Sequence, residues 1–577
     1  MKNRIDKIVS FGAISILLLG GCADFDREFQ SAYNQEQISL EYELSRAQVT
    51  NVYTTLEDGH YTVGDAMLAS LTDEAEYTPQ GTAQLFNSGA WNDQNNPDDK
   101  FAHYYEGIRK ANLFLESEKI VDLSPWKNDP AQSSQLEYQT KKSEVENWPK
   151  EVRFLRAYYY FELIKRYGGV PLLTHSVDLE GDMVSIKRNT LDECIQFIVD
   201  ECDAITNDDG LKITYNSIDL GRATRGAALA LKSRVLLYAA SDLWNMPEKW
   251  APGYANKEYI SVTGDRTEKW KAAAKAAKAV IDLQTEDGKT AYKMSADYTM
   301  LGKTYSGDEI IFVRRVNNDN NFERYNFPAG YPNSSGRITP SQNLVDAYEM
   351  TNGTKFDWNN EVHKANPYEN RDPRLAMTVY TNGAKFKNIT LETYPNGANG
   401  VGPSVPNATT TGYYLRKFVD SNIDLVQNNQ TNHPWIIFRI SEMYLNYAEA
   451  LNEYDPGNAD VSKYASMARG RTGVNMPAIV ETDQDVMRER IRNERRVELA
   501  FEGHRHWDAR RWMTALDEFG SPLYGVNITP VDGGFIYDRK RVEGRVFLPK
   551  MYMYPLPKSV MLNENVIAAG WPQNPEW

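Results

Sequence analysis

The clearest reactive residue in this chain is Cys22, which follows a short apolar run near the N-terminus. A basic start precedes the apolar residues 8–19, and Leu-Gly-Gly stands directly before the cysteine. That run is too short to span a bilayer and is typical of a secretory signal. Small residues before a cysteine are what signal peptidase II accepts, so the Cys22 thiol is predicted to carry diacylglycerol and its freed amine a further acyl chain. We predict a signal peptide over 1–21 and a lipidated tether over 22–36. An ordinary secretory signal with a coincidental cysteine is the alternative.

Motifs of common catalytic sites are missing from the sequence. There is no G-x-S-x-G for acyl transfer, no G-x-x-x-x-G-K-[ST] phosphate loop and no H-E-x-x-H zinc motif. Glycoside hydrolysis needs only two suitably separated carboxylates, and 79 acidic residues leave that chemistry open. The interpretation that we favour is a non-catalytic protein.

The other cysteines and the densest cluster of charged residues and histidines fit structural roles better than catalytic or metal-binding ones. Cys194 and Cys202 share one helical stripe with apolar residues, which predicts two buried thiols and not a bridge. The stretch 488–512 interleaves arginine and glutamate, so mutual pairing such as Arg490 with Glu494 is expected, and its two histidines lack the spacing of a zinc site. The net charge of −15 opposes nucleic acid, because phosphate binding draws on Lys and Arg.

Helical patterns with clear ends dominate both sides of the chain. A helix is predicted over 149–167, with Pro149 in its first turn and a glycine stop after it. Thr190 and Glu193 predict a capping box. Further helices are expected from Thr224, from Glu268, over 485–501 and over 504–516, and 444–451 resembles the first helix of a tetratricopeptide unit. We therefore predict irregular helix pairs.

The central region differs in composition. Between about 289 and 435 Gly, Asn, Thr, Pro and Tyr prevail and helical periodicity fades. Long irregular insertions on a compact body are usually functional or disordered, and the aromatic content favours function. The predicted body, 37–577, is therefore a helical scaffold over about 37–288 and 436–577 with a ligand-facing insertion over about 289–435.

Five segments, in chain order, are similar to segments of the SusD/RagB family of nutrient-binding lipoproteins. They are EVRFLRAYYYFELIKRYGGVPL from Glu151, ITPSQNLVDAYEMTNG from Ile338, WIIFRISEMYLNYAEALNE from Trp435, IRNERRVELAFEGHRHWDARRW from Ile491 and the terminal YPLPKSVMLNENVIAAGWPQNPEW. The resemblance implies an all-α, SusD-like fold of tetratricopeptide-like helix pairs with a loop-rich insertion. It also implies a lipid-anchored place on the outer membrane surface of a Bacteroidetes bacterium, and a SusC-like TonB-dependent transporter as partner.

The resemblance further implies ligand loops near the N-terminal helices and in the insertion. In the loops near the N-terminal helices, Trp91 would stack on a sugar ring beside Asp73, Asn92 and Asn96. An aromatic ring packs on the C–H face of a sugar, and carboxylate and amide groups hydrogen-bond its hydroxyls. The alternative is that Trp91 packs into the body while its polar neighbours form turns. The insertion candidates are Tyr305, Arg324, Tyr325, Tyr331 and Trp358, each also explicable as a structural residue.

No cofactor is predicted. The run NDQNNPDD offers oxygen ligands for Ca²⁺ but lacks the EF-hand pattern, which favours a solvated loop. The leading hypothesis is a surface protein that captures oligosaccharide and delivers it to the transporter. Peptide capture and, less favoured, a surface glycoside hydrolase are the alternatives.

Overall fold

The structure is a computed structural model, which describes residues 40–117, 121–177, 186–207 and 209–577. Within these ranges no helix is both long and apolar enough to cross a membrane. The signal peptide, the tether and Cys22 lie outside the described residues.

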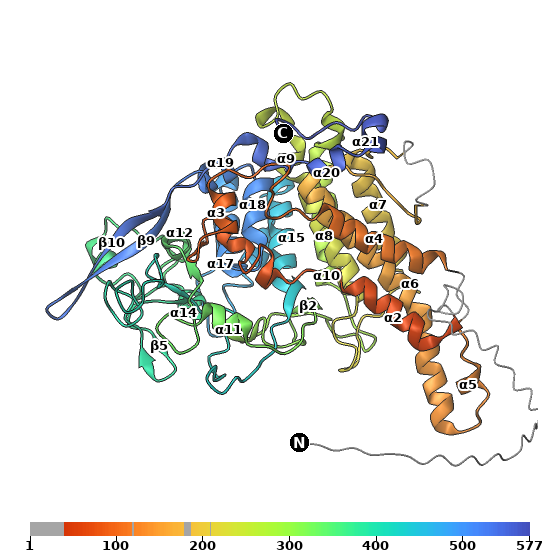
Figure 1. Ribbon diagram of the computed structural model, residues 1–577, viewed down its shortest axis with the longest axis horizontal. Coiled ribbons are helices and arrows are strands. Elements are labelled where there is room, and N and C mark those ends of the chain that lie inside the picture. Colours follow the sequence, from red (N-terminus) through yellow and green to blue (C-terminus); the bar gives the residue numbers. More distant parts are fainter. Residues whose placement is uncertain (1–39, 118–120, 178–185, 208) are drawn as a thin grey trace, which may run out of the picture.

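Eight long helices stand side by side and form one half of the molecule (Figure 1). They are α2 (Tyr42–Tyr53), α4 (Phe101–Glu116), α6 (Gln132–Tyr167), α7 (Leu191–Ala204), α8 (Arg225–Ala240), α10 (Arg266–Ile281), α15 (Ile440–Tyr454) and α17 (Gln484–Glu498). From α4 onward each of them packs against the next one, and α2 packs against α4 and α6. Because every inner helix buries two faces, the arrangement is that of stacked helix pairs. The predicted helix-dominated, SusD-like fold class is confirmed.

The helix α6 differs from its prediction at the N-terminal end. It begins at Gln132, so Pro149 lies inside the helix and not in its first turn. A proline there withholds one backbone hydrogen bond, which is why the sequence pattern indicated a start. Packing against α2 holds the upstream part: the Tyr42 hydroxyl donates to Glu144 (2.6 Å), and the Tyr42 ring lies 5.2 Å from that of Trp148.

The other helix predictions agree with the structure to within a few residues. Thr190 and Glu193 form the predicted capping box of α7, and Thr224 caps α8. The stretch 485–516 folds as α17, α18 (His504–Arg511) and α19 (Ala515–Phe519), with Gly503 left-handed (φ 76°) between the first two. Cys194 and Cys202 are buried free thiols, as predicted.

The insertion consists of short elements joined by loops. They are β2 (Ile310–Arg314), α11 (Asn321–Asn326), β3 (Ile338–Pro340), α12 (Gln342–Ala347), α13 (Glu361–Ala365), α14 (Pro373–Thr378), β4 (Val379–Tyr380), β5 (Lys385–Phe386), β6 (Ile389–Thr390) and β7 (Tyr414–Leu415). Antiparallel pairing of β2 with β8 (Trp435–Arg439) and of β3 with β1 (Ala75–Tyr77) attaches the insertion to the helical half.

A long β-hairpin was not predicted. The strands β9 (Leu523–Val531) and β10 (Gly534–Glu543) pair antiparallel and project from the loop-rich side (Figure 1), within a region assigned to the helical scaffold. Shorter helices complete the fold: η1 (Gly59–Tyr61), η2 (Leu68–Leu71), α3 (Thr82–Asn87), α5 (Ser124–Lys127), α9 (Asp242–Asn245), η4 (Pro247–Lys249), η5 (Lys257–Tyr259), η6 (Tyr298–Met300), α16 (Ala459–Ala465), η7 (Pro549–Tyr552), α20 (Lys558–Met561) and α21 (Glu564–Ala569).

An ionic network of buried side chains joins the two halves. Its members are Glu309, Glu349, Asp372 and Arg374 of the insertion and Arg439, Arg469, Arg471, Glu494, Glu498 and Glu502 of the helical half. Arg374 Nη1 lies 2.6 Å from Glu494 and 3.0 Å from Glu498, while Arg439 Nη1 lies 2.5 Å from Glu309. Buried charges are tolerated when each is paired and hydrogen-bonded, and these are.

The network corrects one expectation about the stretch 488–512. Arg495 pairs within the stretch, with Asp508 (2.7 Å). The predicted pair of Arg490 with Glu494 is wrong, because Arg490 pairs with Glu349 (2.5 Å) of the insertion instead. The partners come from distant segments that sequence spacing does not show.

Candidate functional site

The helix α11 is fixed to the body by its inner side chains. Phe322 is buried edge-on against the His60 ring (4.8 Å between centroids), and buried Glu323 lies 2.9 Å from His433 Nε2. Gly59, next to His60, lets the Trp435 ring pack closely, because a Cβ at residue 59 would lie 2.0 Å from that ring. Anchoring one side of α11 leaves its other side at the molecular surface.

Two neighbouring residues of α11, Arg324 and Tyr325, remain partly exposed. Arg324 donates to Asn320 Oδ1 (2.8 Å) and to Asn428 Oδ1 (3.0 Å), and Asn320 Nδ2 in turn donates to Asn428 (3.0 Å). Hydrogen bonds of this kind restrict the side chains before any ligand arrives. We call the residues Tyr61, Asp65, Arg324, Tyr325, Arg337 and Asn428 the α11 surface.

The Tyr325 ring is held by contacts from two other segments. The Arg337 guanidinium lies 3.8 Å from the ring centroid, and Arg337 pairs with Asp65 (2.6 Å). The Tyr61 ring meets Tyr325 edge-on at 6.1 Å. Burial, together with the neighbouring Asp319 carboxylate, raises the pKa of Tyr61, so its hydroxyl stays protonated and able to donate.

The chain turns back from α11 to Arg337 through a loop that carries Tyr331. Backbone bonds close this loop, from Ser335 N to Arg324 O (2.9 Å) and from Arg337 N to Tyr325 O (2.7 Å). Tyr331 is partly exposed and packs edge-on against Phe386 (5.3 Å). Three predicted candidates, Arg324, Tyr325 and Tyr331, are close in the sequence and lie in this closed segment.

The α11 surface offers rings, guanidinium groups, amides and a carboxylate within one region. Aromatic rings stack on the C–H faces of sugars, and the polar groups both donate to and accept from hydroxyls. Among the described residues no group of three or more His, Cys, Asp or Glu side chains is arranged to hold a metal ion. The arrangement suits binding of a neutral, hydroxyl-rich ligand.

Two other insertion candidates lie apart from this surface. The Tyr305 hydroxyl donates to the Val316 carbonyl (2.6 Å). Trp358 Nε1 donates to Asp346 (3.0 Å), in a loop beside α12. Each holds its own loop in place.

The structure corrects the expectation of an exposed platform at Trp91. The side chain is only 2% exposed and stacks on Phe86 with 4.8 Å between ring centroids, and it also contacts Trp577. Both neighbours are protein rings, so Trp91 is a packing residue in this structure.

Asp73 is likewise buried. Its carboxylate pairs with Arg496 (2.6 Å) and Arg505 (2.8 Å). Burial alone would raise the pKa of Asp73, but the two guanidiniums outweigh it and lower the pKa to about 2. The carboxylate is therefore committed to the scaffold.

The polar run after Trp91 forms turns. Asn92 Oδ1 accepts from the backbone N–H of Gln94 (2.9 Å), and Asn96 Oδ1 accepts from that of Asp98 (3.1 Å). Asp98 is buried against Arg166 (3.1 Å), which leaves it unsuited as a Ca²⁺ ligand.

Beside Asp73, the buried Glu74 predicts a pH dependence. Both of its carboxylate oxygens lack hydrogen-bond partners, and burial, with the nearby charge of Asp73, raises its pKa from 4.5 to about 8. A raised pKa means that the folded state holds the proton more tightly. Stability from this group is fully present below about pH 4.5 and lost as the pH rises through about 8. At about 1.4 kcal/mol per pKa unit, the free energy of unfolding should fall by a few kcal/mol over this pH range. We expect Glu74→Gln to show a smaller fall, because glutamine does not titrate.

Denaturant unfolding of the wild-type and Glu74→Gln proteins at pH 5 and pH 8.5 measures this effect. The exposed Glu41→Gln is the matched control and should keep the wild-type dependence. Equal pH dependence in the wild type and Glu74→Gln would show that Glu74 is not the titrating group.

Sequence reasoning missed Tyr61, Asp65, Arg337 and Asn428. Tyr61 and Asp65 stand in a turn-rich run, DGHYTVGD, where an aromatic residue among turn formers was a usable signal. No signal in the sequence marks Arg337 or Asn428, because only the fold places them near Arg324 and Tyr325.

Comparison with known proteins agrees with the fold. Residues 308–577 match the SusD family, and residues 26–237 match a family described as starch-binding and associating with the outer membrane. The SusD-like protein P38 of Formosa agariphila is 23% identical over 561 residues, which cover 92% of this chain and 97% of that protein.

Solved structures show the same architecture. A SusD-like protein from Bacteroides fragilis is 26% identical, with a TM-score of 0.74 over 94% of this chain and 98% of the other. A SusD-like carbohydrate binding protein from the same organism is 23% identical, with a TM-score of 0.72 over 91% and 98%.

Stacked helix pairs that carry a loop-rich face are the architecture that the chain shares with these SusD-like structures. The two family matches cover most of the described chain and leave residues 238–307 between them unmatched. The chain belongs to the SusD/RagB family.

Proposed function

We propose that this protein is a non-catalytic surface lipoprotein that captures oligosaccharide on the α11 surface. The observation that carries the proposal is the Tyr325 ring, partly exposed and held by Arg337 and Tyr61 beside the amide and guanidinium groups of Asn428 and Arg324. A restrained ring loses little freedom when a sugar stacks on it, which favours binding. The name of the carbohydrate binding relative and the starch-binding description of the matched family support the same ligand class.

The remainder of the proposal concerns location and delivery. The lipid on Cys22 would hold the protein at the outer membrane, with which the matched family is described as associating. From there it would pass the glycan to a SusC-like TonB-dependent transporter. Isolation of the membrane-bound protein with its partners tests this step, because a β-barrel transporter should be recovered with it.

Binding should weaken when the ring is removed. We expect Tyr325→Ala to raise the Kd for an oligosaccharide about two- to tenfold, the range that aromatic contacts of 0.5–1.5 kcal/mol imply. Isothermal titration of the acyl-free chain beginning at Ala23, with a ligand selected on a glycan array, measures the change.

The matched control is Tyr454→Ala, a partly exposed tyrosine on α15 in the helical half. It should leave the Kd unchanged. Equal effects of the two substitutions, selective binding of peptides on a parallel array, or release of shorter sugars during the titration would each contradict the proposal.

A further inference from the structure

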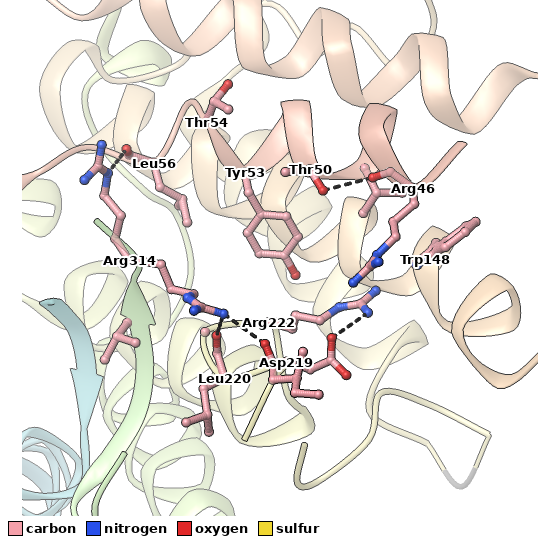
Figure 2. Close-up of a pocket in the computed structure, with 15 residues that line it drawn as sticks. Arg46, Thr50, Tyr53, Thr54, Leu56, Trp148, Asp219, Leu220, Arg222 and Arg314 are labelled. Carbon is pink, nitrogen blue, oxygen red and sulfur yellow. Dashed lines mark hydrogen bonds and ion pairs between the residues drawn. The ribbon is translucent and has the colours of Figure 1, made fainter. Parts of the chain in front are cut away.

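A separate cavity of about 380 Å³ lies between α2, the loop 216–222 and the end of β2. Its volume falls within the range of about 300–1,000 Å³ that ligand sites commonly have. A short segment links it to the α11 surface, because Leu56 lines the cavity and Tyr61 belongs to that surface. Figure 2 shows Arg46 of α2 extending toward Arg222 across this space.

Four arginines line the cavity, and two of them are already neutralised. Arg222 pairs with Glu151 (2.7 Å), with Asp219 (3.5 Å) and with Glu144 (3.7 Å). Arg314 lies 3.4 Å from Asp58 and donates to the Leu56 carbonyl (2.7 Å). Four carboxylates around the cavity are thus engaged by these two guanidiniums.

The other two arginines, Arg46 and Arg315, form no ion pair with any residue in the described part of the chain. Both are exposed at the cavity rim. Arg315 donates to the carbonyls of Ile218 (2.9 Å) and Leu220 (3.4 Å), which fixes its position without cancelling its charge. The cavity therefore has four arginines beside four carboxylates, a balanced local charge in a chain of net charge −15, and two of its guanidiniums have no carboxylate partner of their own.

The interior of the cavity is amphipathic. Val49, Leu56 and Val313 are buried and supply apolar wall. Trp148, only 1% exposed, also lines it, and its Nε1 has no hydrogen-bond acceptor among the described residues. A buried donor without an acceptor is costly, so this part of the cavity wall is not fully satisfied.

We propose that this cavity binds an acidic sugar residue, one that carries a carboxylate or a sulfate ester. The anionic group would lie between Arg46 and Arg315, with the sugar ring against the apolar wall. Guanidinium suits such oxyanions because it presents planar pairs of N–H donors. This inference rests on the proposed glycan function and narrows it to acidic glycans.

Three oligosaccharides with one backbone test the inference: a neutral one, one bearing a uronic acid and one bearing a sulfate ester. Isothermal titration of the acyl-free chain should give about tenfold or tighter binding of at least one acidic ligand, as charged hydrogen bonds imply. The stronger of the two acidic ligands identifies the anionic group. That preference should weaken as salt is added, because exposed charges are screened.

The double variant Arg46→Gln/Arg315→Gln should lose the acidic preference and retain neutral binding. Its matched control is Arg109→Gln/Arg541→Gln, which removes two exposed arginines outside the cavity and should behave as wild type. Equal binding of neutral and acidic ligands, or a preference that survives in the double variant, would overturn the inference and leave the α11 function standing. Absence of binding to all three ligands would instead overturn the glycan function itself, and the acidic preference with it.

Discussion

Glu498→Ala is expected to lower the free energy of unfolding by about 3–5 kcal/mol, the cost of removing one partner from a buried ion pair. The Glu498 carboxylate is fully buried and pairs with Arg374 (3.0 Å), Arg439 (2.7 Å) and Arg471. Burial would raise its pKa, but these guanidiniums outweigh burial and lower it, so the group is charged in the folded protein. The alanine variant would leave three buried cations partly uncompensated. Urea unfolding monitored by tryptophan fluorescence measures the loss.

The control for this variant stands on the same helix. Glu489 is exposed and lies 3.6 Å from Arg492, and surface pairs contribute only about 0–1 kcal/mol. Glu489→Ala should therefore unfold close to wild type. If both variants lost the same small amount, the network would not stabilise the fold in the way described.

Cys22→Ala is expected to abolish lipid attachment completely, because the predicted acyl chains have no other attachment point at the N-terminus. Labelled palmitate should be incorporated into the wild-type protein and be absent from the variant, which should also be lost from the outer membrane fraction. Attachment of several acyl chains gives firm anchoring, so the change in partition should be close to all-or-none.

Cys194→Ala is the matched cysteine control. Its thiol is buried on α7 and donates to the Val170 carbonyl (3.3 Å), and burial raises its pKa to about 12, so it is neutral and shielded. The Cys194→Ala variant should still incorporate labelled palmitate. Label that persists in Cys22→Ala would refute the lipoprotein prediction.

Local signals in the sequence sufficed for most of the helical half. The cap at Thr190 and the stop at Gly168 are short-range features, and both are found where they were expected. Pro149 misled the prediction because Tyr42 of α2, about a hundred residues earlier in the chain, contacts Glu144 and stabilises the helix upstream of the proline. The hairpin β9–β10 was missed because β10 is mostly exposed and lacks the strict apolar alternation that identifies a half-buried strand.

The candidate site was less accessible to sequence reasoning. Arg324 and Tyr325 were candidates through the family resemblance, but Tyr61 and Arg337 reach them only through the fold. Trp91 and Asp73 were chosen as a ring beside a carboxylate. In the structure, Phe86 stacks on Trp91, and two arginines more than four hundred residues away bind Asp73. Burial of a particular ring depends on such long-range packing.

The ionic network also bears on how cargo would leave. Opening a hinge between the insertion and the helices would separate Arg374, Arg439 and Arg469 from carboxylates on the opposite half, and each charge that stayed buried without its partner would cost about 3–5 kcal/mol. A rigid-body movement, in which the loop-rich face and its helical support tilt together, keeps these pairs intact and is the motion that the network favours.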